Sequence, residues 1–280
     1  MNRNLLLSLA AGGALLLTAG AANAQGPHRG GPGFGGPMEL LGFEGGHGGQ
    51  VVKGAPFSAS ATSETTGTLS DGTVIHRTAQ LSLYRDSQGR SRKELTASGF
   101  GPLAASGAPK TLVEISDPVA GVHYGLDTTA KVAYKSAIHA RPAASSDAEA
   151  FHQRMEAQQA SEEAAGLLKK ESLGTQVING ISAEGTRITK TVPAGKIGND
   201  KAFQIVSERW YSPDLQIVVK STRTDPQTGT TTYQVTNIQK TEPAATLFAV
   251  PSDFTVTAGR GGRGPGGPVA GAPAPPPSDE

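Results

Sequence analysis

The chain has 280 residues with 25 basic and 24 acidic side chains, so its charge balance does not favour a nucleic acid or an anionic membrane surface. It contains no cysteine, which excludes disulfides, thiol nucleophiles and a lipid attached to an N-terminal cysteine. Glycine and proline dominate two segments near its ends, and the roughly 200 residues between them suffice for one domain with a sizeable core.

Residues 1–24 have the pattern of a secretory signal peptide. Arg3 precedes a leucine-rich stretch, and Ala22-Asn23-Ala24 forms a small-residue cleavage site. A membrane anchor is the alternative, but Gly12-Gly13 interrupts the apolar stretch. We therefore expect an exported protein, periplasmic or extracellular, with no membrane span after processing. Loss of Arg3 leaves 25 − 1 = 24 basic residues against 24 acidic ones, a formally neutral chain.

Two further segments are expected to be disordered because of their composition. Residues 25–55 are rich in glycine, and residues 258–280 are rich in glycine and proline, so neither can bury enough apolar surface to offset chain entropy. The folded domain is therefore predicted to span residues 56–257.

The first half of this domain is predicted to consist of strands joined by hairpins. Val, Ile, Thr and Tyr are frequent, and turn residues recur at short intervals. Asp71-Gly72 is a two-residue hairpin signal, because glycine accepts the positive φ of a primed turn. Longer turns begin at Asp86 and Asp117. The strands predicted here are residues 57–69, 73–85, 90–98, 110–116, 121–127 and 131–137.

One helix is expected near residues 146–170, where strong helix formers are concentrated. Its apolar stripe is thin: Phe151 and Met155 are four residues apart, and little follows before Leu167 and Leu168. A half-exposed helix lying over the sheet is therefore predicted.

The second half again predicts strands, with a hairpin signal at Asn179-Gly180 and a longer turn beginning at Asp225. No alternating βαβ pattern is present, so the fold class predicted is mainly β: a single open, curved antiparallel sheet with one helix over it. The strands predicted here are residues 173–179, 181–193, 202–212, 215–224, 230–240 and 253–257.

The stretch SERWYSPDLQIVVKS, residues 207–221, holds the only tryptophan and is predicted to be a hairpin around Pro213. An even-numbered loop places Trp210 opposite Ile217, whereas an odd one places Tyr211 there. We choose the even loop because it separates apolar from polar side chains better. Core packing and ligand contact are both open to Trp210. The candidate ligand-binding face consists of Val206, Trp210, Ile217 and Val219.

No motif predicts catalysis, a cofactor or a metal ion. Residues 259–264 match G-x-G-x-x-G, but the helix that this nucleotide-binding fingerprint requires does not follow. The histidines lack the close spacing of a compact metal site. In YRDSQGRSRKEL, Arg90, Arg92 and Glu94 share one strand face, which is either an ordinary solvated surface or an anion contact.

A resemblance adds to these inferences. The succession of ERWYSPDLQIVVKS, a DP-turn hairpin (TRTDPQTGTTTYQVTNIQ) and LFAVPSDFTV resembles the C-terminal half of the periplasmic lipoprotein-carrier superfamily, the LolA, LolB and RseB-like half-barrels. ESLGTQVINGISAEGTRI is similar to a strand pair of uncharacterised exported bacterial proteins. The resemblance implies a half-barrel over residues 57–257, whose concave face can hold acyl chains.

Three classes of function stay open. The first is a non-enzymatic exported module that binds or senses a hydrophobic ligand, either a lipid or a lipidated protein. The second is a passive envelope or surface protein that presents its Gly/Pro tails to partners. The third is a hydrolase whose site the sequence does not reveal. An open apolar concave face would favour the first class, and a fully filled one the second.

Overall fold

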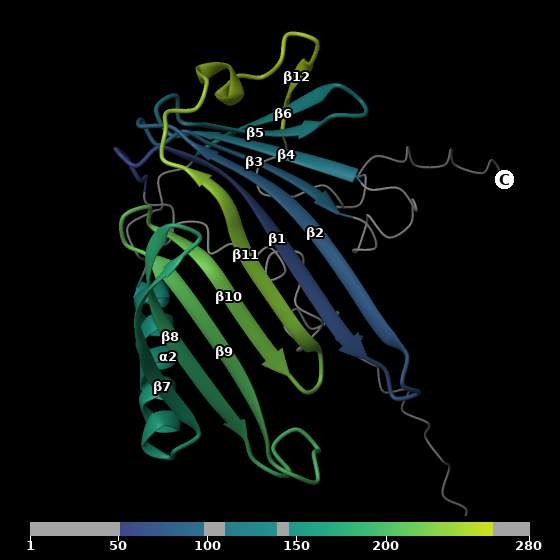
Figure 1. Cartoon of the computed structure of the whole chain (residues 1–280), viewed down its shortest axis with the longest axis vertical. Coiled ribbons are helices and arrows are strands. Elements are labelled where there is room, and N and C mark those ends of the chain that lie inside the picture. Colours follow the sequence, from purple (N-terminus) through teal and green to yellow (C-terminus); the bar gives the residue numbers. More distant parts are fainter. Residues whose placement is uncertain (1–50, 98–109, 139–145, 260–280) are drawn as a thin grey trace, which may run out of the picture. The chain divides into compact units, whose positions relative to one another are not determined.

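A computed structural model describes residues 51–97, 110–138 and 146–259, and its architecture is mainly β (Figure 1). The elements of the first half are β1 Phe57–Thr68, β2 Val74–Arg85, β3 Ser91–Ala97, β4 Lys110–Asp117, β5 Val122–Asp127 and β6 Val132–Ala137. Those of the second half are α2 Ser146–Ala164, β7 Leu168–Ile178, β8 Ile181–Val192, β9 Phe203–Ser212, β10 Ile217–Asp225, β11 Gly229–Gln239, η3 Ala245–Phe248 and β12 Thr255–Ala258. The expected signal peptide and most of both expected tails lie outside the described residues.

The twelve strands form one open sheet in the order β12-β6-β5-β4-β3-β2-β1-β11-β10-β9-β8-β7. Two antiparallel meanders, β1 to β6 and β7 to β11, join where β1 pairs with β11. Only β12 pairs in parallel, adding to β6 at one edge. Helix α2 lies against β7 at the other edge. The predicted fold class, mainly β with an open curved sheet, is confirmed, and the described residues contain one α-helix.

Each predicted strand overlaps an observed one. The prediction succeeded because alternation of side chains and the residue types of turns depend on neighbouring residues in the sequence. Two predictions were wrong. The helix ends at Ala164, short of the predicted residue 170, because Gly166 has a positive φ of +67° and Leu168 already begins β7. Asp71-Gly72 is not a two-residue hairpin loop, since Thr68 pairs with Val74 and leaves five residues between them.

The turn at Asn179-Gly180 is the two-residue hairpin that the sequence predicts. Both residues have positive φ, +50° and +81°, and Ile178 pairs directly with Ile181. The Asn179 amide donates a 2.6 Å hydrogen bond to the carbonyl of Val235 on β11. This bond ties the tip of the β7–β8 hairpin back to a strand three positions away from β8 in the sheet.

Aspartates close several of the other turns. Asp117 accepts hydrogen bonds from the amides of Val119 and Ala120 at 2.9 Å, and Asp127 does the same for the two corresponding residues of its turn. Such side-chain bonds replace the strand ladder where the chain reverses. Asp-containing turns are therefore the local signal that divides this sequence into strands.

The sheet curves toward the face that carries Arg85 at the end of β2. The Arg85 guanidinium donates from Nη2 to the carbonyl of Leu215, in the turn between β9 and β10. On a flat sheet, β2 and β10 would be three strand spacings apart, about 14 Å, which is farther than an arginine reaches. We call the side that bears Arg85 the concave face and the other the convex face.

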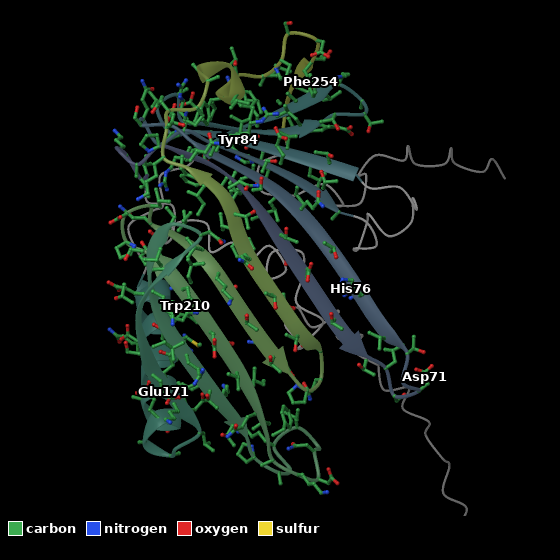
Figure 2. All side chains as sticks on the ribbon, in the orientation of Figure 1. Asp71, His76, Tyr84, Glu171, Trp210 and Phe254 are labelled. Carbon is green, nitrogen blue, oxygen red and sulfur yellow. The ribbon has the colours of Figure 1, made fainter. Side chains whose placement is uncertain are left out.

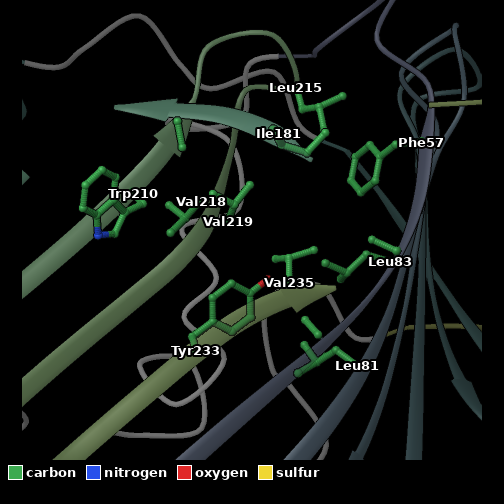
Figure 3. Packing of buried hydrophobic residues seen from close by; sticks show 13 residues of the cluster. Phe57, Leu81, Leu83, Ile181, Trp210, Leu215, Val218, Val219, Tyr233 and Val235 are labelled. Atoms are coloured by element: carbon green, nitrogen blue, oxygen red, sulfur yellow. The ribbon is translucent and has the colours of Figure 1, made fainter. Parts of the chain in front are cut away.

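The main core lies at this curved end and joins strands from both meanders (Figure 3). Phe57, Leu81 and Leu83 are contributed by β1 and β2, and Figure 3 shows them facing residues of β10 and β11. The buried members are Phe57, Ala59, Ala61, Leu81, Leu83, Ile181, Ala183, Trp210, Leu215, Val218, Val219, Tyr233 and Val235. The first and last thirds of the domain must therefore fold together.

A second core lies on the convex face of β4, β5 and β6. Val113, Ile115, Leu126 and Ala133 are buried there, and the segment after β11 contributes Val250 and Phe254. Phe254 lies near β12, far from Asp71 at the tip of the β1–β2 hairpin (Figure 2). The C-terminal segment thus covers a convex apolar area that would otherwise be exposed.

Close packing at Gly185 predicts a selective loss of stability. A Cβ at this position would lie 2.7 Å from two carbons of the Trp210 ring and 2.8 Å from the Cβ of Leu173. We expect Gly185→Ala to lower the free energy of unfolding by about 1–3 kcal/mol in urea titrations, as overpacking does.

Gly125→Ala is the matched control, since Gly125 also lies in a strand but has no atom within 4 Å of its added Cβ. Equal effects of the two substitutions would contradict the packing described around Trp210.

Candidate functional site

The concave face can be read from the strand pairing, because directly paired residues point to the same side of a sheet. Ala97, Ala79 and Ser63 form one row, which continues through Tyr233 to Ser221. The next row toward the curved end is apolar and runs from Leu95 through Leu81 and Ala61 to Val235. The floor of this face is therefore largely apolar and is made by five neighbouring strands.

Partly exposed apolar side chains surround this floor. Leu95 and Leu112 lie at the β3–β4 side, and Ile75 lies near the β1–β2 turn. On the other meander, Ile205 is partly exposed and Ile188 is 40% exposed. Their pairing partners place all five on the concave side. The face thus offers hydrophobic surface beyond what the core buries.

Arg85 is a buried cation at the deep end of this face, with 8% of its surface exposed. Nε donates to the carbonyl of Ala55 at 3.0 Å, and the guanidinium lies 4.8 Å from the centre of the Phe57 ring. Burial lowers the pKa of Arg85 to about 10, so it remains charged at neutral pH. Backbone carbonyls and an aromatic ring stabilise this charge, which makes Arg85 a structural clamp.

Lys93 on β3 is a second basic residue on the concave face, and its pKa is lowered. Burial lowers its pKa to about 8, while the carboxylate of Glu114 opposes the shift. Lys93 pairs with Leu83 on one side and with Glu114 on the other. Its ammonium group therefore loses its proton far more readily than an exposed lysine does.

Charge is distributed unequally between the two faces of the five central strands, β2, β1, β11, β10 and β9. By pairing and alternation, their concave side carries four arginines and one acid: Arg77, Arg85, Arg209, Arg223 and Asp225. Their convex side carries one lysine and two acids: Lys220, Glu64 and Glu208. The described charges give +4 − 1 = +3 on the concave side and +1 − 2 = −1 on the convex side.

Convex charges at the two ends of the sheet are neutralised locally. Arg187 binds Glu208 at 2.6 Å, Lys169 binds Glu171 at 2.8 Å, and Arg92 binds Glu94 at 2.6 Å. These are exposed or partly exposed pairs of small energetic value. These three pairs therefore add no net charge to the convex face.

The loop of the SERWYSPDLQIVVKS hairpin is even-numbered, as predicted, because Ser212 pairs with Ile217 and leaves four residues between them. The predicted pairing of Trp210 with Ile217 is wrong. Trp210 pairs with Lys220 and not with Ile217, because Ile217 pairs with Ser212 and an irregularity interrupts the pairing between Val218 and Lys220. A β-bulge inserts an extra residue and so exchanges the faces of the strand beyond it. The bulge therefore places Trp210 opposite Lys220, whereas an uninterrupted hairpin would place it opposite an apolar residue of β10.

The four residues predicted to bind ligand are placed as follows. Trp210 and Val219 are buried members of the main core, and Ile217 packs against that core. Val206 lies on the convex side opposite Thr224 and is not among the residues of that core. Trp210 shares a face with Lys220 and Gly185, opposite to the face of Arg209. A ligand-binding role for the four stays a prediction, but they do not form one surface.

The charged stretch YRDSQGRSRKEL holds the C-terminal segment. Arg90 binds the buried carboxylate of Asp86 at 2.5 Å and lies 5.3 Å from the centre of the Phe248 ring. Arg92 donates to the carbonyl of Leu247 at 3.1 Å. These contacts dock η3 on the sheet and so give the segment a structural role.

Within the described residues, no three His, Asp or Glu side chains come together as a metal site would require. No described helix has the length and apolarity needed to span a membrane. The arginines at positions 77, 209 and 223 were not selected by the sequence analysis. The sequence did contain a signal for them. Each arginine lies an even number of residues from the concave residues of its own strand, so strand alternation places it on the same face.

No family model matches this sequence, and no curated protein matches it. The chain is similar to several solved structures at low sequence identity. A chain of the MucA/MucB complex of Pseudomonas aeruginosa is 14% identical with a TM-score of 0.37, over 73% of this chain and 59% of that one. LprF from Mycobacterium bovis is 11% identical with a TM-score of 0.31, over 72% and 91%. A LolA-superfamily protein from Nitrosomonas europaea is 8% identical with a TM-score of 0.27, over 70% and 90%.

The lowered pKa of Lys93 predicts a pH-dependent stability. Below about pH 8 both the native and the unfolded chain hold this proton, and the native state bears the full cost of the buried charge. Between about pH 8 and 10.5 the native state has released a proton that the unfolded chain retains, so the free energy of unfolding rises with pH.

We expect this rise to reach about 3 kcal/mol relative to Lys93→Met, since each pKa unit corresponds to about 1.4 kcal/mol. Urea titrations of both proteins from pH 7 to 10.5 measure it. Stability curves that stay parallel over this range would show that Lys93 is not desolvated.

The buried position of Trp210, with 7% exposure, predicts blue-shifted fluorescence from the single indole. Trp210→Ala should lower the free energy of unfolding by about 3–5 kcal/mol, as large-to-small core changes do. Tyr134→Ala, at a 47% exposed aromatic residue, serves as the control and should cost less than about 1 kcal/mol. Red emission from the native protein would contradict this placement.

Proposed function

We propose that the protein is an exported, non-enzymatic module that binds a hydrophobic ligand, a lipid or the lipid group of a partner protein, on its concave face. The observation that carries the proposal is the combination of a continuous apolar floor with partly exposed apolar residues around it, Ile75, Leu95, Leu112, Ile188 and Ile205. A sheet face of this kind is stable in water only when another layer covers it. The floor residues themselves are already buried, as Leu81 and Val235 are with 4% and 0% exposure, so the surface left for a ligand is that of the partly exposed residues around them. Helix α2 lies against β7, and its Glu162 binds Lys190 of β8, so α2 contacts the sheet at one edge.

Export rests on the signal-peptide pattern of residues 1–24. A binding role is favoured over a hydrolase because the polar groups of the concave face serve packing and charge placement. Arg85 is held by backbone carbonyls, and Lys93 lies beside Leu83 and Glu114. Neither arrangement includes a nucleophile with an oriented general base.

A pair of adjacent residues tests which face binds. Ile205 lies on the concave side of β9 and Val206 on the convex side, and both are partly exposed. We expect the purified protein to bind the neutral apolar dye N-phenyl-1-naphthylamine, and Ile205→Asn to weaken binding about tenfold by removing apolar contact. Val206→Asn is the matched control and should leave the affinity unchanged.

Mass spectrometry of lipid extracted from the purified protein provides an independent test. Recovered lipid that the dye displaces supports the proposal. If neither dye nor lipid binds, the proposal fails and a passive envelope protein is favoured. If Val206→Asn weakens binding and Ile205→Asn does not, the ligand site is on the opposite face, where the sequence-based prediction included Val206.

A further inference from the structure

The C-terminal segment, residues 240–259, is held at the surface of the sheet by few buried contacts. Phe248 is the one buried residue of this segment, and all four residues of β12 are exposed at the edge beside β6 (Figure 1). The ion pair between Lys131 and Asp253, at 3.0 Å, joins side chains that are 53% and 59% exposed. Few buried contacts and solvent-exposed hydrogen bonds are the features of regions that open well below the free energy of global unfolding.

The surface beneath the segment is, by contrast, fully buried. Val113, Ile115 and Leu126 form an apolar patch on the convex face of β4 and β5, against which Val250 and Phe254 of the segment pack. Opening of the segment would expose this patch to water, together with the hydrogen-bonding edge of β6. An open molecule therefore presents a surface that is more stable when it is covered again.

The segment itself shows what fits this surface. β12 pairs in parallel with β6, and the amide of Thr255 donates to the carbonyl of Lys131 at 2.8 Å. Arg92 of β3 donates to the carbonyl of Leu247 at 3.1 Å. A second copy of this chain carries an identical segment, so it can cover the same surface with the same contacts.

The linker between β11 and η3, residues 240–244, has little slack. η3 contacts β3 and β4, and two strands, β1 and β2, separate β3 from β11. These three strand spacings amount to about 14 Å. A linker of this length reaches about 20 Å when fully extended, so crossing the sheet uses about two thirds of its reach. The amide of Ser87 in the β2–β3 turn also donates to Glu242 at 3.1 Å, which fixes the middle of the linker. Short, taut linkers favour exchange of the segment they carry between two copies.

We infer that two copies of this chain exchange their C-terminal segments, so that β12 of each copy pairs with β6 of the other. The patch around Ile115 has the same cover in this dimer as in the monomer, and the two states differ in the direction of the linker. In the dimer the linker extends away from its own sheet instead of crossing β1 and β2. The concave face takes no part in the exchange, so this inference is independent of the proposed function.

An engineered disulfide tests the exchange, because the chain contains no cysteine of its own. Tyr134→Cys combined with Thr257→Cys places two thiols on exposed, directly paired residues of β6 and β12, within the range of a disulfide. Oxidation of a dilute sample should lock the segment within its own chain and keep the protein monomeric at every concentration in size-exclusion chromatography with light scattering. The reduced variant and the unsubstituted protein should form dimers when concentrated. Oxidation of the isolated dimer should give a covalent dimer on non-reducing gels.

The matched control is His123→Cys combined with Ser136→Cys. These residues pair directly between β5 and β6, so their disulfide forms within one chain in both states and should leave dimer formation unchanged. Thermal unfolding of each variant confirms that the fold is retained.

Linker length provides a second test that needs no cysteine. Insertion of Gly-Ser-Gly-Ser after Thr241 gives the linker slack, and should lower the association constant of the dimer about tenfold. Deletion of Thr241 tightens the linker and should raise the association constant.

Three outcomes would overturn the inference. The first is an unsubstituted protein that stays monomeric up to millimolar concentration. The second is a dimer whose oxidation yields only monomers on non-reducing gels, since the two copies would then associate without exchanging segments. The third is an association constant that does not respond to the length of the linker.

Discussion

The curvature of this sheet depends on one buried cation. Arg85 at the end of β2 reaches the carbonyl of Leu215 across two intervening strands, and also binds the carbonyl of Ala55. A buried guanidinium without partners would cost several kcal/mol, so the two carbonyls and the Phe57 ring have to stay in place around it. Because these partners come from a segment before β1 and from the β9–β10 turn, Arg85 fixes both meanders to one concave surface.

The irregularity in β10 works with this clamp. Lys220 still pairs with Trp210 and Gln234, but on the other side of the bulge Val218 pairs with Tyr211, and pairing with β11 has ended. The strand can therefore bend over the core, where both Val218 and Val219 are buried. Asn179 binds the Val235 carbonyl beyond the last β10–β11 pair, so a backbone group that the bend leaves unpaired is satisfied. The irregularity in β10 thus contributes to the curvature of the sheet, to the burial of Val218 and Val219, and to the docking of the β7–β8 hairpin on β11.

Much of the fold could be predicted because its signals are local. Alternation and Asp-containing turns located all twelve strands, and the Asn179-Gly180 turn formed as expected. The start of β7 was missed because Lys169, Lys170 and Glu171 are helix formers that pairing with β8 holds in a strand. The hairpin register was missed because a bulge responds to bending of the whole sheet and has no signature in SERWYSPDLQIVVKS. The strand that carries Arg77 and Arg85 did contain information, since both share their face with Ala79, Leu81 and Leu83.

Net charge describes this protein poorly, because its charges are separated by face. The chain is close to neutral, with 25 basic and 24 acidic side chains, yet its central strands place four arginines on one side. Like charges held on an inward-curving, partly dehydrated surface repel one another more strongly than they would on an exposed one. The lowered pKa of Lys93 on the same face reflects the same dehydration.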